Sequence, residues 1–342
     1  MAKQEVIKQV VGIDIGKEKF FACYQIKDLD EYVVIKGTKS FRNDNGGYKE
    51  FLLWCKKREK TTVAPTIYVM EATGIYYEDL AYFLYENGCK VSVQLAQKLT
   101  YFAKSNNLKT KTDKVDAKMI ATFGIEKALE TLKIWEPPSK EFRVIRDLAR
   151  EHTSLKEDLT AAKNQLHAMK HAHQTYERVI KLKEEMISFY QEQLKSIEKE
   201  LKVFIKANQQ LSNKIKNIET IKGVGFITIV KVLAEVNGFL LFKNIRQLVS
   251  YAGLDVVEKE SGNFKGKTRI SKKGNARLRS VLYMPAMTAA THNNNIRTFY
   301  KRVNTDRKIK KHGIVAVMRK LLILIYTLWK KDEPYQIDYK MR

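Results

Sequence analysis

Four acidic residues in the first third of this chain have the types and spacing that metal-dependent phosphodiester chemistry requires. Asp14 and Glu71 each end a short apolar run that is typical of a buried strand. Asp113 and Asp116 are three residues apart at the start of a helical stretch, so they lie on one helix face. Hard divalent cations prefer several oxygen ligands, and paired ions can hold the attacking and leaving oxygens of a phosphodiester. We therefore predict that these four acids bind Mg²⁺, with two ions in one active site.

Each acid also has a purely structural interpretation, which the residue pattern leaves open. Asp14 caps a turn in that interpretation, Glu71 is an exposed strand end, and Asp113 is the N-cap of its helix. The order of the acids, on a first strand, after a fourth strand and on a later helix, favours a joint role. Three lysines surround the acid pair and either hold phosphate or form a solvated face: Lys109, Lys111 and Lys114.

A second set of reactive groups lies in a basic segment from Lys259 to Arg279, which contains eight basic residues and three glycines. Flexible backbone N–H groups and cationic side chains together suit the binding of phosphate. Ser261, which precedes a glycine, is either an accessible nucleophile or an ordinary turn residue. Thr220 and Ser271 are the competing hydroxyl groups, and we interpret Ser271 as a phosphate contact. The predicted nucleic-acid-binding residues of this segment are Lys265, Lys267, Arg269, Ser271, Lys272, Lys273, Arg277 and Arg279.

The positive charge of the chain is unevenly distributed. The 342 residues carry a net charge of +25. Residues 1–139 contain 22 basic and 18 acidic residues, residues 140–216 contain 16 and 11, and residues 217–342 contain 25 and 9. An excess concentrated in one third of a chain is typical of a protein that binds a polyanion such as nucleic acid.

A membrane location is not expected. The apolar run Leu321–Trp329 is too short to cross a bilayer, and the N-terminus lacks the apolar region of a signal peptide. Cys23, Cys55 and Cys89 are widely spaced and form no CxxC pair, which is typical of reduced thiols. We expect a cytoplasmic protein without a cysteine metal site.

Residues 1–138 are predicted to form an α/β domain that positions the four acids. Alternating and apolar segments predict strands within residues 10–26, 32–36, 66–70 and 91–95. Helical patterns cover residues 48–57, 77–86 and 113–123. Strands followed by strand–helix alternation indicate an α/β domain, and the proline pair at residues 137 and 138 ends it.

The rest of the chain is predicted to be mainly helical. Residues 139–222 contain no glycine or proline, and their apolar residues recur every three or four positions. This pattern predicts two long, coiled-coil-like helices over residues 139–216, with a turn near residues 171–176, that pack within one chain or between subunits. A C-terminal domain, residues 217–342, then begins with a string similar to a helix-hairpin-helix, in which Lys222, Gly223 and Gly225 either contact a nucleic-acid backbone or only pack.

Several of these motifs together resemble one family. The positions of the acids are similar to those of the RuvC-like branch of the ribonuclease H fold. Asp14, the string Glu71-Ala-Thr-Gly, the Asp113-x-x-Asp116 pair and the block from Ser261 to Arg279 occur in the order seen in DEDD-type insertion-sequence transposases. These enzymes are related to the Piv DNA invertase and are also called bridge-RNA-guided recombinases. The resemblance covers nearly the whole chain.

The resemblance implies a fold, a chemistry and a set of partners. The fold is an N-terminal RuvC-like catalytic domain, a helical insert, and a mainly helical C-terminal transposase domain with a helix-hairpin-helix. The four acids then bind Mg²⁺, and Ser261 attacks DNA to form a phosphoserine. A non-coding guide RNA pairs with donor and target double-stranded DNA. Homodimers join into a homotetramer at the nucleoid of a prokaryotic cell, with Ser261 of one subunit beside the acids of another.

We therefore predict a Mg²⁺-dependent transposase that cuts and rejoins DNA under the direction of an RNA. Two alternatives stay open. The first is a RuvC-like endonuclease that selects DNA junctions and hydrolyses them with a metal-activated water. The second is a non-catalytic protein that binds nucleic acid on a decayed ribonuclease H scaffold.

Overall fold

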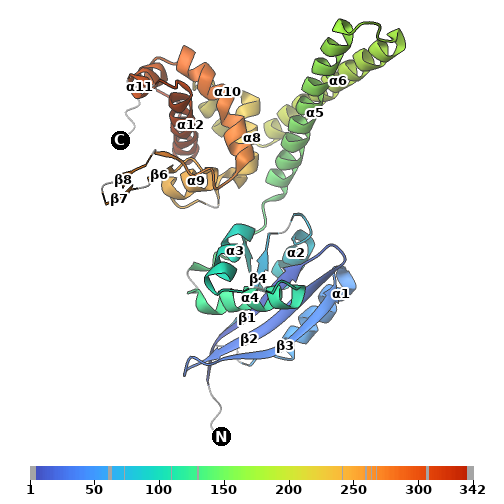
Figure 1. Ribbon diagram of the computed structural model, residues 1–342, viewed down its shortest axis with the longest axis vertical. Helices are drawn as coiled ribbons and strands as arrows, with labels where there is room; N and C mark the ends of the chain where they lie inside the picture. Colours follow the sequence, from blue (N-terminus) through green and yellow to red (C-terminus); the bar gives the residue numbers. More distant parts are fainter. Residues whose placement is uncertain are drawn as a thin grey trace. The chain divides into compact units, whose positions relative to one another are not determined.

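The chain folds into two compact units, Met1–Pro137 and Pro138–Arg342 (Figure 1). The computed structural model describes residues 5–60, 64–72, 74–108, 110–128, 131–240, 242–258, 260–262, 264–266, 268–305 and 308–336. Its first unit is mixed α/β and its second is mainly helical. The further division of the second unit near residue 216 stays a prediction.

The first unit is built on a five-stranded mixed sheet with the order β3-β2-β1-β4-β5. Its strands are β1 (Val6–Ile15), β2 (Lys19–Asp28), β3 (Val33–Arg42), β4 (Thr66–Glu71) and β5 (Lys90–Gln94). The first three strands are antiparallel neighbours, whereas β4 is parallel to β1 and β5 is parallel to β4. Because Ile13 is paired with Met70, β1 and β4 end at the same edge of the sheet.

Helices cover both faces of this sheet. α1 (Asn45–Lys56) and α2 (Glu78–Glu86) share one apolar core with the sheet, and α3 (Ala96–Ser105) and α4 (Asp113–Glu126) share another. Successive side chains of a strand point to opposite faces, so Val11 belongs to the first core and Val10 to the second. The alternation places Asp14 on the same face as Val10, and Glu71 on the same face as Val69. Both acids therefore lie on the face that α4 covers.

Helix α4 packs very closely against β1, because each of the two elements has a glycine at the contact. A Cβ added to Gly12 would overlap the backbone of Ala117 and lie 2.6 Å from the Cα of Ala121. A Cβ added to Gly124 would lie 2.6 Å from Val10 Cγ1. These contacts run in opposite directions along the two elements, so α4 is antiparallel to β1. The first turn of α4 therefore lies near the carboxyl end of β1.

The predicted strands and helices of this unit are confirmed, with two differences. Strand β3 continues to Arg42 instead of ending near residue 36. It is an edge strand with mostly exposed side chains, so it lacks the apolar alternation that marks a strand. Helix α3 is absent from the predicted elements, because Leu99 is its one fully buried residue in the described part of the chain.

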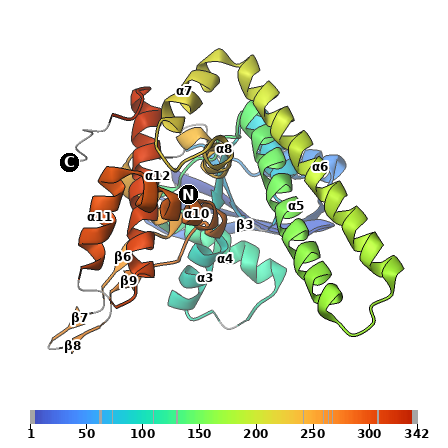
Figure 2. The ribbon, with the colours of Figure 1, turned by 90° about the horizontal axis from the view of Figure 1, so that it is seen from above.

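The second unit begins with an antiparallel pair of long helices, α5 (Lys140–His171) and α6 (Glu177–Ala207), as the sequence predicts (Figure 2). Ser139 caps α5 by accepting a hydrogen bond from the backbone N–H of Phe142. The first turns of α5 bury Ile145 and Ala149 in the core of the unit, whereas most side chains near the hairpin turn are exposed. The pair is thus anchored at one end.

The remaining helices form a bundle with α12 in its core. They are α7 (Gln209–Glu219), α8 (Phe226–Glu235), α9 (Ile245–Ala252), α10 (Ala276–His292), α11 (Asn294–Asn304) and α12 (Lys311–Lys331). Among the described residues, α12 is the one helix long and apolar enough to cross a membrane, and it is longer than the run Leu321–Trp329 suggests. However, 56% of its apolar stretch is buried within the unit. The apolar character of α12 is therefore that of a core helix.

Two short strand pairs separate α9 from α10. Strand β6 (Val256–Val257) pairs with β9 (Arg269–Ile270), and β7 (Glu260–Ser261) pairs with β8 (Phe264–Lys265), both antiparallel. Figure 2 shows the β7–β8 pair as a hairpin that extends beyond β6 and β9. The hairpin carries the predicted serine nucleophile at its tip.

Candidate active site

The structure brings the four predicted acids together at one edge of the first unit. Asp14 and Glu71 stand at the neighbouring carboxyl ends of β1 and β4, on the face covered by α4. Asp113 and Asp116 occupy the first turn of α4, which lies near that end of β1. The four acids span 102 positions of the sequence, from 14 to 116. Nevertheless, the ionisation of Asp14 is influenced by each of the other three acids. Three separate elements therefore supply one acidic cluster.

The pKa of Asp14 is raised from 3.8 to about 6 by burial and by the neighbouring acids. Burial is the largest cause, followed by the negative charges of Asp116, Asp113 and Glu71, while Lys111 acts in the opposite direction. The pKa of Asp116 is also raised, first of all by burial. Carboxylates that oppose one another's ionisation are stabilised by a cation placed among them.

The donor set fits a hard divalent cation such as Mg²⁺, because all four side chains offer carboxylate oxygens. Within the described ranges, no three histidine, cysteine, aspartate or glutamate side chains lie close enough together to hold a metal ion. A cation placed among the acids would offset the repulsion between their like charges. The acids therefore form a loose cluster whose chemistry suits the ion.

Replacing Asp14 by asparagine is expected to stabilise the metal-free protein in a pH-dependent manner. The pKa of Asp14 is raised on folding, so the proton it binds stabilises the folded state fully below pH 3.8, and this contribution is lost as the pH rises through about 6. An asparagine side chain carries no charge at any pH. After a reduction for screening by solvent, the gain in the free energy of unfolding at pH 7.5 is about 1 kcal/mol. Calorimetric unfolding in the presence of a chelator measures this gain, which should vanish near pH 4. An equal effect at both pH values would contradict the charge mechanism.

The structural alternative for Asp113 is wrong, because Thr112 is the N-cap of α4. The Thr112 hydroxyl accepts a hydrogen bond of 3.3 Å from the backbone N–H of Val115. Lys111 and Lys114 are exposed beside the acids, as a phosphate contact requires. Lys109 lies outside the described residues.

Ser261 is exposed at the tip of the β7–β8 hairpin. It is paired with Phe264 across the hairpin, and the next residue, Gly262, has a φ of +53° that favours glycine. Within the described part of the chain, no hydrogen bond involves the Ser261 side chain, and Phe264 is 65% exposed. The hydroxyl of Ser261 is thus accessible to a macromolecular substrate. It belongs to the second unit, whereas the four acids belong to the first.

The two competing hydroxyl groups are both engaged in structural hydrogen bonds. Ser271 donates to Asp255 Oδ1 over 2.6 Å and accepts from the backbone N–H of Lys273. Thr220 donates to the carbonyl of Asn217 and accepts from the backbone N–H of Tyr335 over 2.8 Å. The predicted role of Ser271 as a phosphate contact therefore competes with its bond to Asp255. Of the three hydroxyl groups, Ser261 is the one for which the described residues show no such hydrogen bond.

The basic residues of the serine segment, residues 259–279, differ in their surroundings. Arg279 is half-buried and donates from Nη1 to the carbonyls of Ala252 and Gly274, so the structure gives it a packing role beside its predicted phosphate contact. Lys267 lies outside the described residues, and Lys265 is described only as part of β8. The exposed members of the set are Arg269, Lys272, Lys273 and Arg277.

A polar network that the sequence analysis does not identify anchors the base of the serine segment. Asn275 caps α10 and donates to Glu235 Oε2 over 2.8 Å and to the Tyr251 hydroxyl over 3.1 Å. Glu235 also accepts from Arg150 Nε of α5 over 3.1 Å. Asn275 has the sequence signal of an N-cap, but its partners lie on other helices and carry no local signal. The network joins α5, α8 and α9 to the start of α10.

The predicted helix-hairpin-helix segment consists of α7, a turn and α8, and its two glycines differ. Gly223 has a φ of +99°, and a Cβ added there would lie 2.7 Å from the backbone nitrogen of Ala289 in α10. Gly225, at the N-cap of α8, is exposed with no heavy atom near an added Cβ. Lys222 is exposed as well. Gly223 therefore has a packing role, and Gly225 and Lys222 are accessible to a phosphate.

Gly223→Ala is expected to lower the free energy of unfolding by about 2–4 kcal/mol, because the new Cβ meets fixed backbone at a positive φ. Gly225→Ala, the matched control two residues away, has open space and a φ of −95°, so its stability should change by less than about 1 kcal/mol. Chemical denaturation of both variants measures the difference. Similar losses in the two variants would contradict the close approach of Gly223 to α10.

Comparison with known proteins assigns the chain to a family. A model for DEDD transposases of the IS110 type, described as "Transposase", matches residues 11–172, which include all four acids. A second model, described as "Transposase IS116/IS110/IS902 family", matches residues 215–301, which include Ser261. The chain belongs to the IS110 family of transposases. As a family member, this transposase is a DNA-recombining enzyme, and the DEDD domain indicates acidic catalytic residues and the use of a divalent metal.

Its relatives include proteins that match over nearly their whole length. The pilin gene-inverting proteins of Moraxella bovis and Moraxella lacunata are each 28% identical over 330 residues, which cover 96% of this transposase and 98% of each relative. The transposase for insertion sequence element IS1111A of Coxiella burnetii is 28% identical over 135 residues, 39% of this chain and 37% of that protein. A solved structure of a Ppx/GppA family protein of Aquifex aeolicus is 11% identical to this chain. The alignment covers 96% of this chain and 92% of the Aquifex aeolicus chain, with a TM-score of 0.22.

Proposed function

We propose that this transposase cuts and rejoins donor and target DNA through a covalent phosphoserine intermediate. Asp14, Glu71, Asp113 and Asp116 would hold two Mg²⁺ ions, and Ser261 is the nucleophile. The observation that carries the proposal is the convergence of the four acids from β1, β4 and α4 on one edge of a sheet. An exposed serine at the tip of a hairpin within a basic segment supplies the second component.

The strand arrangement supports a RuvC-like ribonuclease H fold for the first unit. Three antiparallel strands followed by two parallel strands, in the order β3-β2-β1-β4-β5, place acids on the central strand, its parallel neighbour and a helix packed across both. In the second unit, the antiparallel α5–α6 pair supports the proposed coiled-coil character, and α7 and α8 with their glycine turn support the proposed helix-hairpin-helix.

The four acids provide the charge that this chemistry needs at neutral pH. With a pKa of about 6, Asp14 is mostly ionised at pH 7.5 and can serve as a ligand. Bound Mg²⁺ would lower the pKa of a hydroxyl nucleophile and neutralise charge on the scissile phosphate. Lys111 and Lys114, exposed beside the acids, attract the DNA backbone to this edge.

Ser261 performs a transfer that conserves the number of phosphate ester bonds. Its Oγ attacks the phosphorus of the DNA backbone and loses its proton, while one backbone P–O bond breaks and the leaving oxygen accepts a proton. The phosphorus stays a diester, linked now to serine. A hydroxyl group of another DNA end can then attack this phosphoserine and reseal the backbone without ATP.

Guide RNA, a homodimer and a homotetramer complete the proposal. The charge of residues 217–342, with 25 basic and 9 acidic residues, suits the backbones of DNA and a non-coding RNA. Because the acids and Ser261 belong to different units, an active site can combine the acids of one subunit with Ser261 of another. The free cysteines Cys23, Cys55 and Cys89 suit a reducing cytoplasm, where the nucleoid supplies the DNA.

Trapping of protein-linked DNA tests this proposal. The full chain is incubated with Mg²⁺ and end-labelled DNA, with and without candidate guide RNA, and then denatured. We expect labelled DNA attached to protein, and peptide mass spectrometry that locates the link at Ser261. Cut DNA without any attachment would instead support a hydrolytic endonuclease. Binding without metal-dependent cutting would support a non-catalytic nucleic-acid-binding protein.

A further inference from the structure

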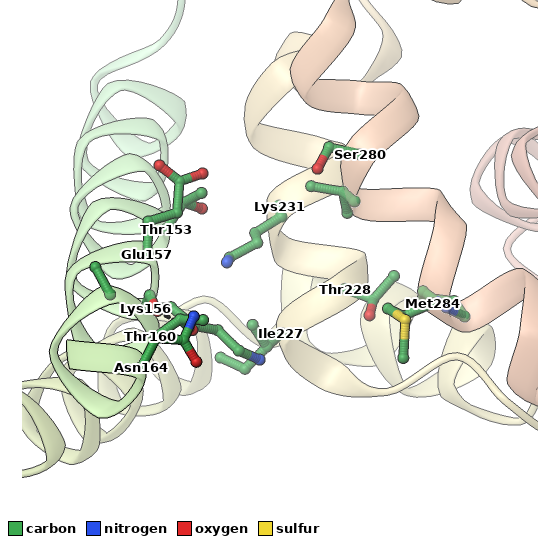
Figure 3. Close-up of a pocket in the computed structure, with 13 residues that line it drawn as sticks. Thr153, Lys156, Glu157, Thr160, Asn164, Ile227, Thr228, Lys231, Ser280 and Met284 are labelled. Atoms are coloured by element: carbon green, nitrogen blue, oxygen red, sulfur yellow. Dashed lines mark hydrogen bonds between the residues drawn. The ribbon is translucent and has the colours of Figure 1, made fainter. Parts of the chain in front are cut away.

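A cavity of about 570 Å³ lies between α5, α8 and α10 of the second unit, away from the serine hairpin and unused by the chemistry above (Figure 3). One wall is the polar face of α5, and the opposite wall is formed by α8 and α10. Its lining residues are Thr153, Lys156, Glu157, Thr160, Ala161, Asn164, Ile227, Thr228, Lys231, Ser280, Val281, Met284 and Pro285. Cavities of this size hold ligands as large as a nucleotide.

Two cations face this cavity from opposite walls. Figure 3 shows Lys231 extending from α8 toward α5, and Lys156 extending from α5 toward Ile227. Lys231 is half-buried, and it makes no hydrogen bond or ion pair in the part of the chain that the structure describes. Burial and the charge of Lys156 lower the pKa of Lys231 to about 8, and the carboxylates of Glu157 and Glu198 only partly oppose them. An anion between the two ammonium groups would relieve both unfavourable effects.

The rest of the lining suits a ring system with polar edges. Ile227, Val281, Met284 and Pro285 form an apolar surface on α8 and α10, and Met284 is 63% exposed. Pro285 lies inside α10 and has no N–H, so the carbonyl of Val281 one turn earlier lacks its helical donor. That carbonyl can accept a hydrogen bond from a ligand. Hydroxyl and amide groups from α5, together with Ser280, supply further partners.

From this arrangement we infer that the cavity binds one nucleotide unit, with its phosphate between Lys156 and Lys231 and its base against the apolar wall of α8 and α10. The chemistry that is recognised is a nucleoside phosphate, which is supplied either by an unpaired position in a nucleic-acid strand or by a free mononucleotide. The site is independent of the proposed serine chemistry, because it uses neither the acids nor Ser261. It adds a specific contact to the general attraction of the basic surface.

Equilibrium binding to the full chain tests the site with two probes, adenosine 5′-monophosphate and a short fluorescein-labelled oligodeoxyadenylate. Lys231→Gln removes the half-buried cation, and we expect it to weaken binding at least about tenfold. Met284→Glu places a negative charge at the exposed edge of the cavity and should act in the same direction. Lys163→Gln is the matched control, since Lys163 is an exposed lysine of α5 outside the cavity.

The pattern of losses identifies the source of the nucleotide. If both variants weaken the mononucleotide, the site accepts a free nucleotide. If they weaken only the oligonucleotide, the site accepts an unpaired position within a strand. The inference is overturned if both variants bind both probes as Lys163→Gln does. Because Met284 is exposed, Met284→Glu keeps the test decisive if Lys231→Gln fails to fold.

Discussion

Ser261→Ala is expected to abolish the protein-linked DNA intermediate and to reduce strand exchange by at least about ten-thousandfold. The substitution removes the attacking oxygen, and the two competing hydroxyl groups are engaged in hydrogen bonds. Ser271 is bonded to Asp255, and Thr220 is bonded to Asn217 and Tyr335. Since Ser261 is exposed and makes no side-chain hydrogen bond among the described residues, folding and DNA affinity should stay unchanged. The measurement is the yield of covalent adduct and of joined product on denaturing gels.

Thr268→Val is the matched control, because it removes an exposed hydroxyl group from the same segment. It should retain nearly full activity. A Ser261→Ala enzyme that still cuts DNA in a metal-dependent reaction would eliminate the serine mechanism and support hydrolysis by water. Retained adduct in this variant would assign the nucleophile to another residue, which peptide mapping would identify.

Asp14→Ala is expected to reduce both adduct formation and strand joining by about a thousandfold or more, since the proposed divalent-metal site loses one of its four carboxylates. The negative charges of the other three acids all raise the pKa of Asp14, so its removal affects the whole proposed ligand set. The same variant should raise the thermal stability of the metal-free protein above pH 6, because it relieves repulsion. Loss of activity combined with a gain in stability is a result that mere disruption of the fold would not produce.

Asp158→Ala, an exposed aspartate of α5 remote in sequence from the acids, is the matched control and should leave activity and stability nearly unchanged. Calorimetry of Mg²⁺ binding and the adduct assay give the two readouts. An Asp14→Ala enzyme that binds Mg²⁺ as tightly as the unsubstituted protein and retains its activity would remove Asp14 from the active site.

Much of the local structure follows from the sequence, because it depends on short-range rules. Apolar runs that end in Asp14 and Glu71 indicate buried strands, and a spacing of three places Asp113 and Asp116 on one helix face. The long helices α5 and α6 follow from an uninterrupted apolar repeat. Edge strand β3 and helix α3 are less predictable, since they bury few side chains and carry a weak periodic signal.

The sequence by itself determined which residues are suited to hold a divalent cation, to attack a phosphate and to contact a polyanion, because side-chain chemistry and local periodicity are properties of the chain. Only the tertiary structure decided which of them meet. Parallel pairing of β1 with β4, and the close approach of α4 at Gly12, bring the acids together. The hydrogen bond to Asp255 engages the hydroxyl of Ser271, whereas Ser261 has no such bond among the described residues, and the cavity around Lys231 joins three helices. These results depend on contacts between residues far apart in the sequence, which no local pattern records.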